Sequence, residues 1–290
     1  MNTADLLVVN PKGGGPWRRV VKRARREVPG LTIVIPESRD ELRDELTRAA
    51  EKGLSRILIL GGDGTFSETV NVVYRLQLPL SLGFLAGGRG ADFIRSLHIH
   101  RRAGTQSPLF TCDCFRVESD LGARYGLNVV STGLSGAVVE RIQSKVPHLP
   151  ASLLYIVTAI RCSLKFKACE LNLRIDGEKY THERSLVVAI ANGRFFGGGM
   201  PIAPEANISD GILEVVTLPW RPYPAILKLA VDLYRARHPG RNDVNVRKGK
   251  RISIVTCEGA HLEIDGDPYG TLPAHIEVIP GAISTWNPSW

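Results

Sequence analysis

Regular alternation of two kinds of segment constrains the fold of the first hundred residues more than any other feature of this sequence. Short aliphatic runs alternate with longer segments whose apolar residues recur at helical spacing, such as Trp17, Val20 and Val21. A β-α-β-α order of this kind predicts a parallel sheet with helices on both faces. We expect strands at 6–9, 31–35, 56–60 and 80–85, and helices at 17–28, 40–52, 65–76 and around 93–97.

The pattern changes after about residue 107. Strand-like segments dominate there, and Asp176-Gly177 is typical of a two-residue hairpin turn. We therefore expect an α/β domain at 1–107 and a mainly antiparallel β domain at 108–290, with a tail at about 281–290 that packs back on the first domain. The second domain is predicted to contain strands at 110–118, 124–131, 170–176, 184–191, 212–217, 251–256, 261–264 and 275–279, and helices near 150–164 and 223–236.

Composition excludes several classes of protein. With 290 residues, of which 43% are hydrophobic, the chain is typical of a folded protein rather than a disordered tail or a fibre. No apolar run approaches the roughly 18 residues of a membrane-spanning helix. The N-terminus carries Asp5 and no basic stretch, so we expect a first strand there and not a signal peptide. Five cysteines without a C-x-x-C pair favour reduced thiols in a cytoplasmic protein.

A Gly-rich turn, Gly61 to Thr65, follows the third predicted strand and opens a helix. Glycines let the backbone approach a phosphate closely, and the first turn of a helix offers unpaired N–H groups. Asp63 would repel a phosphate, so its presence implies a bridging cation. The alternative is a plain strand-to-helix turn without a ligand.

Two further Gly-rich turns, at 10–15 and 85–93, also follow predicted strands. All three turns would lie at the carboxyl ends of parallel strands, where open α/β sheets bind ligands. The sequence has no G-x4-G-K-[ST] loop and no H-R-D loop, which excludes P-loop NTPases and protein kinases.

Six motifs in a fixed order extend over nearly the whole chain. They resemble the N-P-x-S-G, G-G-D-G-T-x-x-E, G-T-x-N-D-F, A-N-G…G-G-G…I-A-P-x-A, D-G-x-L-D and D-G-E motifs of the diacylglycerol kinase catalytic-domain family, which includes bacterial lipid kinases and sphingosine kinases. The matching residues are Asn10-Pro11; Gly61 to Thr65 with Glu68; Gly88 to Phe93; Ala191 to Gly193, Gly197 to Gly199 and Ile202 to Ala206; Asp210 to Leu213; and Asp265 to Asp267.

This resemblance implies a two-domain lipid kinase. Its N-terminal α/β domain, with a parallel sheet like that of phosphofructokinases and NAD kinases, would bind ATP. Its C-terminal, mainly antiparallel β-sandwich would take the lipid. The enzyme would transfer the γ-phosphoryl group of ATP, with Mg²⁺, to the hydroxyl of diacylglycerol or a related lipid alcohol. By carry-over, the nucleotide would contact Asn10, Pro11, Lys12, Gly13, Gly14, Gly61, Gly62, Asp63, Gly64, Thr65, Phe66, Ser67, Gly88, Arg89 and Asp92.

The resemblance also implies catalytic and metal-binding residues. The family's base in D-G-E falls at Asp267, with Asp265 beside it. Asp63 would act on Mg²⁺ through water or the ATP-bound ion. A further, supporting metal would be held by the Asp210 side chain and by backbone carbonyls of Asn207 and Ile212. Whether that metal is Mg²⁺ or Ca²⁺ stays open, because both prefer oxygen ligands.

Five positions depart from the family pattern. Gly14 replaces a Ser, Arg89 a Thr, Ala91 an Asn, Ser67 an Asn, and Asp267 a Glu that is one methylene longer. A base displaced by about 1 Å costs on the order of 100-fold in rate. The departures leave open a slow enzyme, a different acceptor, or a non-catalytic protein that binds nucleotide or lipid. A kinase for a soluble substrate such as NAD is the nearest rival, because NAD kinases share the G-G-D-G-T element.

A second D-G-E sequence, Asp176 to Glu178, matches the family motif better by letter than Asp265 to Asp267 does. It precedes the A-N-G motif, whereas the family's catalytic copy follows D-G-x-L. We expect Asp176-Gly177 to be a hairpin turn and not a catalytic element.

Basic residues gather on the first predicted helix, opposite its apolar face, and the chain as a whole has a net charge of +8. Such a run is ordinarily a solvated helix face. In a lipid kinase it favours peripheral docking on anionic lipid at the inner face of the membrane, worth about 1 kcal/mol per basic residue. Nucleic acid is disfavoured because no recognition motif occurs, and a homodimer stays open. The basic residues are Arg18, Arg19, Lys22, Arg23, Arg25 and Arg26.

Overall fold

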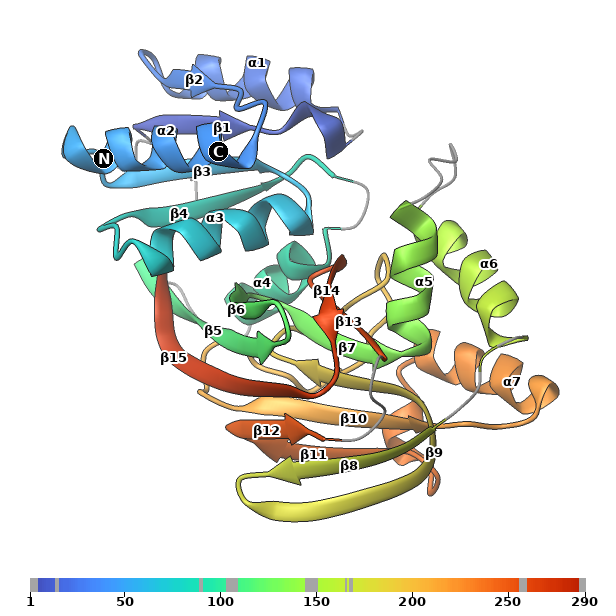
Figure 1. Ribbon diagram of the computed structural model, residues 1–290. Coiled ribbons are helices and arrows are strands. Elements are labelled where there is room, and N and C mark those ends of the chain that lie inside the picture. Colours follow the sequence, from blue (N-terminus) through green and yellow to red (C-terminus); the bar gives the residue numbers. More distant parts are fainter. Residues whose placement is uncertain are drawn as a thin grey trace.

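The computed structural model describes residues 5–13, 16–88, 91–102, 109–143, 151–164, 166, 169–255 and 260–286. Its N-terminal part contains four parallel strands in the order β2-β1-β3-β4, which confirms the prediction (Figure 1). The residues of β1 are all buried, because helices cover both faces of the sheet. The strands are β1 (Leu6–Val9), β2 (Thr32–Val34), β3 (Arg56–Gly61) and β4 (Ser81–Ala86).

Four helices pack on these strands. Because successive strand residues face opposite sides, α1 lies over Leu7 and Leu58 on one face, and the other three helices lie over Leu6 and Ile57 on the other. The helices are α1 (Trp17–Glu27), α2 (Arg39–Glu51), α3 (Asp63–Arg75) and α4 (Asp92–Arg102).

The C-terminal part is mainly antiparallel, again as predicted. The strand β9 pairs with β8 along its first half, and with β7 and β10 along its second half. Apolar residues from these strands form one shared core. The strands are β5 (Leu109–Ser119), β6 (Gly122–Gly126), β7 (Val129–Gly133), β8 (Cys169–Ile175), β9 (Glu178–Ala191), β10 (Leu213–Pro219), β11 (Asn245–Gly249), β12 (Arg251–Ile254), β13 (His261–Ile264), β14 (Asp267–Thr271) and β15 (Ala274–Trp286).

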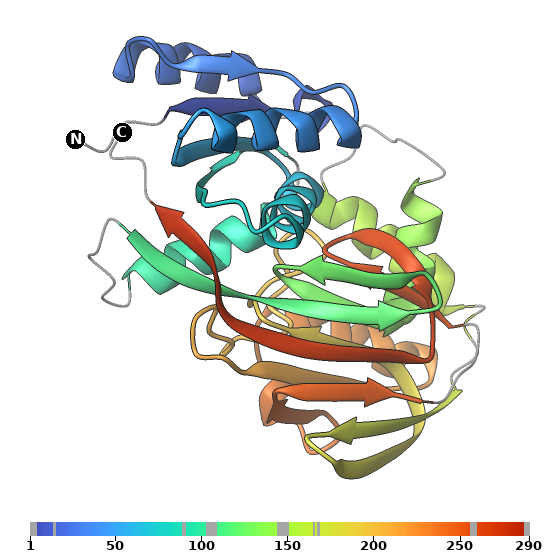
Figure 2. The ribbon, with the colours of Figure 1, turned by 60° about the vertical axis from the view of Figure 1, so that its left-hand side comes forward.

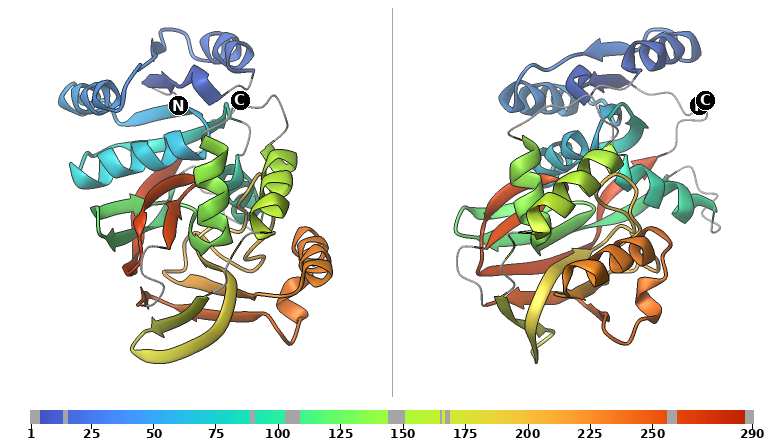
Figure 3. Two further views of the ribbon diagram at one scale, coloured as in Figure 1. Left: turned by 45° about the vertical axis from the view of Figure 1, so that its right-hand side comes forward. Right: turned by 90° about the vertical axis from the view of Figure 1, so that its right-hand side faces the viewer.

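Three helices lie on one flank of these strands: α5 (Leu134–Gln143), α6 (Ala151–Ser163) and α7 (Tyr223–Tyr234) (Figure 3). They pack through a second apolar cluster that includes Val138, Tyr155 and Leu229. Two short 3-10 helices, η1 (Pro11–Gly13) and η2 (His238–Gly240), complete the described elements. Within the described residues, no helix is long and apolar enough to cross a membrane.

The last strand connects the two parts of the molecule. β15 runs antiparallel to β5 and then reaches β4, where Thr285 pairs with Leu82 in parallel register (Figure 2). Trp286 is fully buried there, and its Nε1–H donates to the Ser81 carbonyl at 3.1 Å. Gly83 makes room for the indole, because a Cβ at that position would lie 3.0 Å from Trp286 Cε2. The C-terminal segment therefore packs into the N-terminal core.

The Asp265 side chain accounts for one error in the predicted strands. The strand predicted at 124–131 is in fact two strands, β6 and β7. The backbone N–H groups of Leu127, Asn128 and Val129 donate to the Asp265 carboxylate, and this interrupts the ladder. A buried side chain from a distant segment thus decides where β6 ends and where β7 begins.

Three other elements escaped prediction because their sequences are atypical. β11 is a charged edge strand with four exposed residues, and β14 contains Pro268 and Gly270. α5 contains Gly136, a poor helix former. That glycine is required by packing, because a Cβ would lie 2.3 Å from the His261 carbonyl oxygen.

Candidate functional site

The three Gly-rich turns meet at the carboxyl ends of β1, β3 and β4. The Asn10 side-chain amide donates to the Thr65 hydroxyl at 2.9 Å, which joins the first turn to the second. A Cβ on Gly88 would lie 2.6 Å from the Gly62 Cα, so the second and third turns touch through their backbones. The glycine at 88 is therefore needed for this close approach, whereas a Cβ on Gly62 would make an ordinary contact, 3.5 Å from the Gly88 Cα.

The remaining residues of these turns differ in what they offer a ligand. Pro11, Lys12 and Gly13 form η1, and the Lys12 ammonium donates to the Glu37 carbonyl at 3.1 Å. The Phe66 ring packs edge-on against Phe84 in the core, so only the backbone of Phe66 is available to a ligand. Gly14 and Arg89, which we predict to contact nucleotide, lie outside the described residues.

Asp63 links the second turn to α4. Its carboxylate accepts the backbone N–H groups of Asp92, at 3.1 Å, and Phe93, at 2.9 Å, and so caps the start of that helix. Burial raises the pKa of Asp63 to about 6, with a further contribution from the neighbouring Asp92 carboxylate. A buried pair of carboxylates favours a bound cation, which would offset both charges.

Asp92 reaches from α4 toward the second half of the chain. Its Oδ2 accepts the Gly198 N–H at 2.8 Å, and its Oδ1 is paired with Arg95. Burial raises the pKa of Asp92 despite these two partners. The contact explains the glycines at 197–199, whose positive φ angles turn a backbone N–H toward this carboxylate.

Asp265 lies in the tight turn between β13 and β14, where Asp265 and Gly266 have φ angles of 52° and 87°. Its carboxylate accepts three backbone N–H groups, from Leu127 and Asn128 at 2.8 Å and from Val129 at 3.0 Å. Burial raises its pKa, although these hydrogen bonds oppose the shift. The Ser67 hydroxyl, on α3, lies beside it.

The A-N-G motif, Ala191 to Gly193, packs against the segment that binds the Asp265 carboxylate. The Asn192 amide donates to the carbonyls of Asp113, at 3.0 Å, and Leu127, at 2.8 Å. A Cβ on Gly193 would lie only 1.9 Å from Asn128 Oδ1. The motif therefore positions the Asn128 backbone, whose N–H holds Asp265.

Glu263, on β13, is a buried carboxylate that sequence reasoning missed. It is 3% exposed, and it accepts a hydrogen bond from the Ser131 hydroxyl, which is itself 2.6 Å from the Ser135 hydroxyl. Burial raises its pKa to about 7, with smaller contributions from Asp265, Asp267 and Asp92. No motif marks Glu263 in the sequence, because its burial follows from the pairing of β13 with β7, where it lies opposite Ser131.

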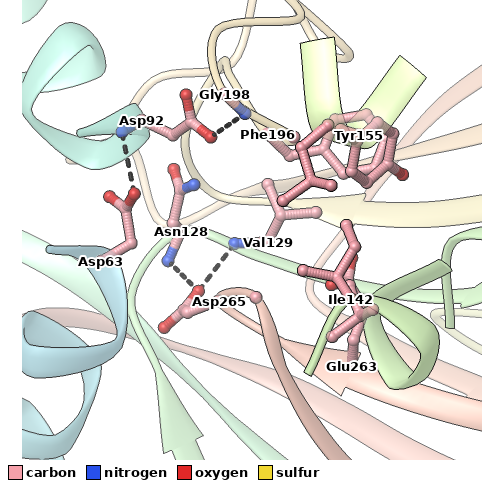
Figure 4. A pocket seen from close by; sticks show the side chains of 14 residues that line it. Asp63, Asp92, Asn128, Val129, Ile142, Tyr155, Phe196, Gly198, Glu263 and Asp265 are labelled. Atoms are coloured by element: carbon pink, nitrogen blue, oxygen red, sulfur yellow. Dashed lines mark hydrogen bonds between the residues drawn. The ribbon is translucent and has the colours of Figure 1, made fainter. Parts of the chain in front are cut away.

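These groups surround a cavity of about 260 Å³ between the two halves of the chain. Figure 4 shows Asp63, Asp92 and Asp265 on one side of it and large apolar side chains on the other. Among the described residues, no Lys, Arg or His lines the cavity. Its carboxylates are Asp63, Asp92, Glu263 and Asp265, and its apolar wall contains Val139, Ile142, Leu154, Tyr155 and Phe196.

Asp267 does not line this cavity. Its Oδ2 lies 3.1 Å from the Arg124 guanidinium and 3.5 Å from that of Arg39, in a separate groove beside α3. Its carboxylate is also close to the start of α3, since a Cβ on Gly64 would lie 3.5 Å from Asp267 Oδ1. The structure thus separates the two carboxylates of the D-G-D sequence and brings only Asp265 to the cavity.

The predicted supporting metal site is a pair of tight turns in this structure. Asn207 Oδ1 accepts the N–H and hydroxyl of Ser209, and Asp210 Oδ1 accepts the Ile212 N–H at 3.1 Å. Within the described ranges, no three His, Cys, Asp or Glu side chains are arranged to hold a metal. The supporting metal stays a prediction.

The better-matching D-G-E sequence is a hairpin turn, as predicted. Asp176 and Gly177, with φ angles of 50° and 97°, connect β8 to β9. The Asp176 carboxylate accepts the backbone N–H groups of Lys250 and Arg251. Asp265-Gly266 has the same turn conformation, so location and not turn type distinguishes the two copies.

Comparison with known proteins gives matches over both halves of the chain. Residues 5–115 match the family model "Diacylglycerol kinase catalytic domain", and residues 128–286 match "YegS C-terminal NAD kinase beta sandwich-like domain". A Staphylococcus aureus (strain bovine RF122 / ET3-1) protein named "Putative lipid kinase" is 30% identical over 268 residues, which cover 87% of this chain and 85% of that protein. The chain belongs to the diacylglycerol kinase catalytic-domain family.

Solved structures share the fold. A crystal structure titled as a putative diacylglycerol kinase from Bacillus anthracis str. Sterne aligns with a TM-score of 0.76 at 23% identity, covering 99% of this chain and 98% of that one. A second structure, titled as a diacylglycerol kinase from the same organism, aligns with a TM-score of 0.71 at 22% identity over 99% of this chain and 98% of that one. Family membership makes this chain a kinase-type protein, and the part that matches the catalytic-domain model carries the three Gly-rich turns.

Proposed function

We propose that this protein is an ATP-dependent lipid kinase that transfers the γ-phosphoryl group of Mg–ATP to the hydroxyl of diacylglycerol or a related lipid alcohol. One observation carries the proposal: the three Gly-rich turns adjoin a cavity, and Asp63 and Asp92 lie between the turns and that cavity. The cavity has carboxylates on one side and an apolar wall on the other. Phosphoryl transfer needs phosphates held beside a positioned alcohol. The Gly-rich turns would hold the phosphates, and the cavity would hold the alcohol.

The nucleotide end would be formed by the turns at 10–13, 61–65 and 88. Backbone N–H groups at the start of α3 suit phosphate oxygens. The raised pKa values of Asp63 and Asp92 favour a cation beside them. Mg²⁺ that arrives with ATP would offset their charge and that of the phosphates.

The acceptor end would place the lipid hydroxyl near Asp265. A proton acceptor must first be within reach of the hydroxyl, and only then does its pKa matter. Asp265 lines the cavity and has a raised pKa. Asp267, by contrast, lies outside and is paired with Arg124 and Arg39. We therefore assign proton uptake to Asp265 and a supporting role at the nucleotide side to Asp267.

A radiolabelled γ-phosphate transfer assay tests the reaction. The acceptors would be diacylglycerol, monoacylglycerol, sphingosine and ceramide in anionic mixed micelles, with NAD as a soluble control. We expect labelled lipid from the wild-type protein and none from Asp63→Asn. The matched control is Asp176→Asn, the same change in a hairpin turn remote from the cavity, which should keep full activity.

Other outcomes of this assay point elsewhere. Label in NADP would identify a soluble-substrate kinase. ATP binding without transfer to any acceptor would identify a non-catalytic binding protein. Full activity of Asp63→Asn would overturn the assigned phosphate site.

Two further variants separate the carboxylates of the D-G-D turn. We expect Asp265→Asn to lower kcat by about 10²-fold or more, the usual worth of a general base. Asp267→Asn should act mainly on the KM for ATP. Urea unfolding of both variants checks that the fold is kept, so that a lower kcat is not caused by unfolded protein. A loss of kcat confined to Asp267→Asn would reverse the assignment.

We also propose peripheral docking on anionic membrane through α1. All six of its basic residues are exposed, whereas Ala24 and the apolar face pack on the sheet. Reversing four charges, at Arg18, Arg19, Lys22 and Arg23, should abolish sedimentation with phosphatidylglycerol vesicles. The control reverses Arg174 and Lys179 beside the β8–β9 hairpin, at the opposite end of the molecule (Figure 1). Equal sedimentation of the wild type, the α1 variant and the control would mean that the basic residues of α1 are only a solvated helix face.

A further inference from the structure

Glu263 differs from the other cavity carboxylates in how few partners it has. Asp265 accepts three backbone N–H groups, Asp63 accepts two, and Asp92 has both Gly198 and Arg95. Among the described residues, only the Ser131 hydroxyl donates to Glu263. A carboxylate can accept about four hydrogen bonds, so most of the acceptor capacity of Glu263 is unused.

Among the described residues, the lining of the cavity offers Glu263 no basic side chain that would compensate its charge. The charged groups that act most strongly on it are Asp265, Asp267 and Asp92, and all three are carboxylates. A buried polar group without partners costs free energy until a donor reaches it. The site is therefore arranged to receive a hydrogen-bond donor from a ligand.

The position of Glu263 indicates which part of a ligand would reach it. In Figure 4 it lies on the side of Ile142, away from Asp63 and Asp92. The Ser131 hydroxyl, which is itself 2.6 Å from the Ser135 hydroxyl, holds its carboxylate in place. A lipid whose reacting hydroxyl lies near Asp265 would present its next functional group to Glu263.

We propose that Glu263 is a specificity-determining residue that accepts a hydrogen bond from a second donor of the lipid acceptor, a hydroxyl or ammonium next to the hydroxyl that is phosphorylated. This proposal rests on the proposed lipid kinase function and deepens it. Long-chain amino alcohols and monoacyl diols carry such a donor. Diacylglycerol has only ester oxygens at that position. Ester oxygens accept hydrogen bonds but cannot donate one to Glu263.

Kinetics with three acceptors test this role. Wild type and Glu263→Gln would be compared with sphinganine, monooleoylglycerol and dioleoylglycerol in mixed micelles. The Gln side chain keeps the shape and the contact with Ser131 but turns a donor toward the ligand. Because a hydrogen bond to a charged group is worth roughly 10- to 100-fold, the ratio of kcat/KM for sphinganine or monooleoylglycerol to that for dioleoylglycerol should fall by that factor, mainly through KM.

The matched control is Glu214→Gln. Glu214 is also a 3% exposed glutamate, but it lies on β10, pairs with Lys248 and does not line the cavity. Its variant should keep the wild-type ratio. A larger fall for sphinganine than for monooleoylglycerol would assign the donor as the ammonium, and equal falls would assign it as the hydroxyl. An equal loss for all three acceptors, or an unchanged ratio, would overturn the proposal.

Equilibrium dialysis with short-chain, water-soluble forms of the same three acceptors gives a readout without turnover. Glu263→Gln should weaken binding of the amino alcohol and the monoacyl diol by the same factor relative to the diacyl compound. If wild type phosphorylates no acceptor, the lipid kinase function fails, and these dissociation constants still decide the role of Glu263. Unchanged relative dissociation constants would then reject it.

Discussion

Replacing Glu263 by Gln should change how the stability of the folded protein depends on pH. Burial raises the pKa of Glu263 from 4.5 to about 7. Between these values the native state holds a proton that the unfolded chain has released, so wild-type stability falls as pH rises through this window. The Gln variant has no such titration. Its free energy of unfolding should therefore rise relative to wild type by about 3 kcal/mol from pH 4.5 to pH 7, at about 1.4 kcal/mol per pH unit.

Urea unfolding of both proteins at several pH values from 4.5 to 8.5 measures this difference. The charges of Asp265, Asp267 and Asp92, which face Glu263, are present in both proteins, so most of their own titration cancels. The difference should be smallest at pH 4.5, grow up to about pH 7 and be constant above it. A difference independent of pH would refute the reasoning, because Glu263 would then ionise like an exposed glutamate.

Three further predictions concern packing and reactivity. Gly193→Ala should destabilise the protein by about 1–3 kcal/mol in urea unfolding and reduce transfer activity, because its Cβ would overlap Asn128 Oδ1; wild-type values would contradict this packing. Trp286→Ala should cost about 3–5 kcal/mol, and an unchanged urea midpoint would mean that β15 does not anchor the N-terminal sheet. Cys112 and Cys114, whose pKa values burial raises, to about 12 for Cys112, should resist a thiol reagent in the native protein; rapid labelling located by mass spectrometry would argue against their burial.

Much of the fold was predictable because its signals are local. The parallel strands are buried on both faces, so they appear in the sequence as continuous aliphatic runs such as 57–60. The Asp176-Gly177 turn was predictable for a similar reason, since the conformation it needs favours those two residue types. Elements whose residues serve a distant contact were not predictable. Gly136 in α5 and Gly270 in β14 look like breaks in a local pattern.

The candidate site also has a part that was predictable from the sequence and a part that was not. Ordered motifs place Asp63, Asp92 and Asp265 in one family pattern, and the structure brings these three to one cavity. The same motifs place Asp267 next to Asp265, but the turn directs their side chains to different surroundings. Glu263 carries no motif at all. Its role depends on Ser131 and on the lack of a basic neighbour among the described cavity residues, which are facts of packing.

The sequence by itself determined the fold class, the family and the three Gly-rich turns, because each depends on residues that are near one another along the chain. The tertiary structure alone decided which carboxylates share a cavity, how many hydrogen bonds each accepts and how far burial raises its pKa. These properties come from the contact of β13 with β7 and of Asp92 with Gly198, segments separated by about a hundred residues or more. A pattern along the chain carries no information on such distances, whereas desolvation and hydrogen bonding depend on them directly.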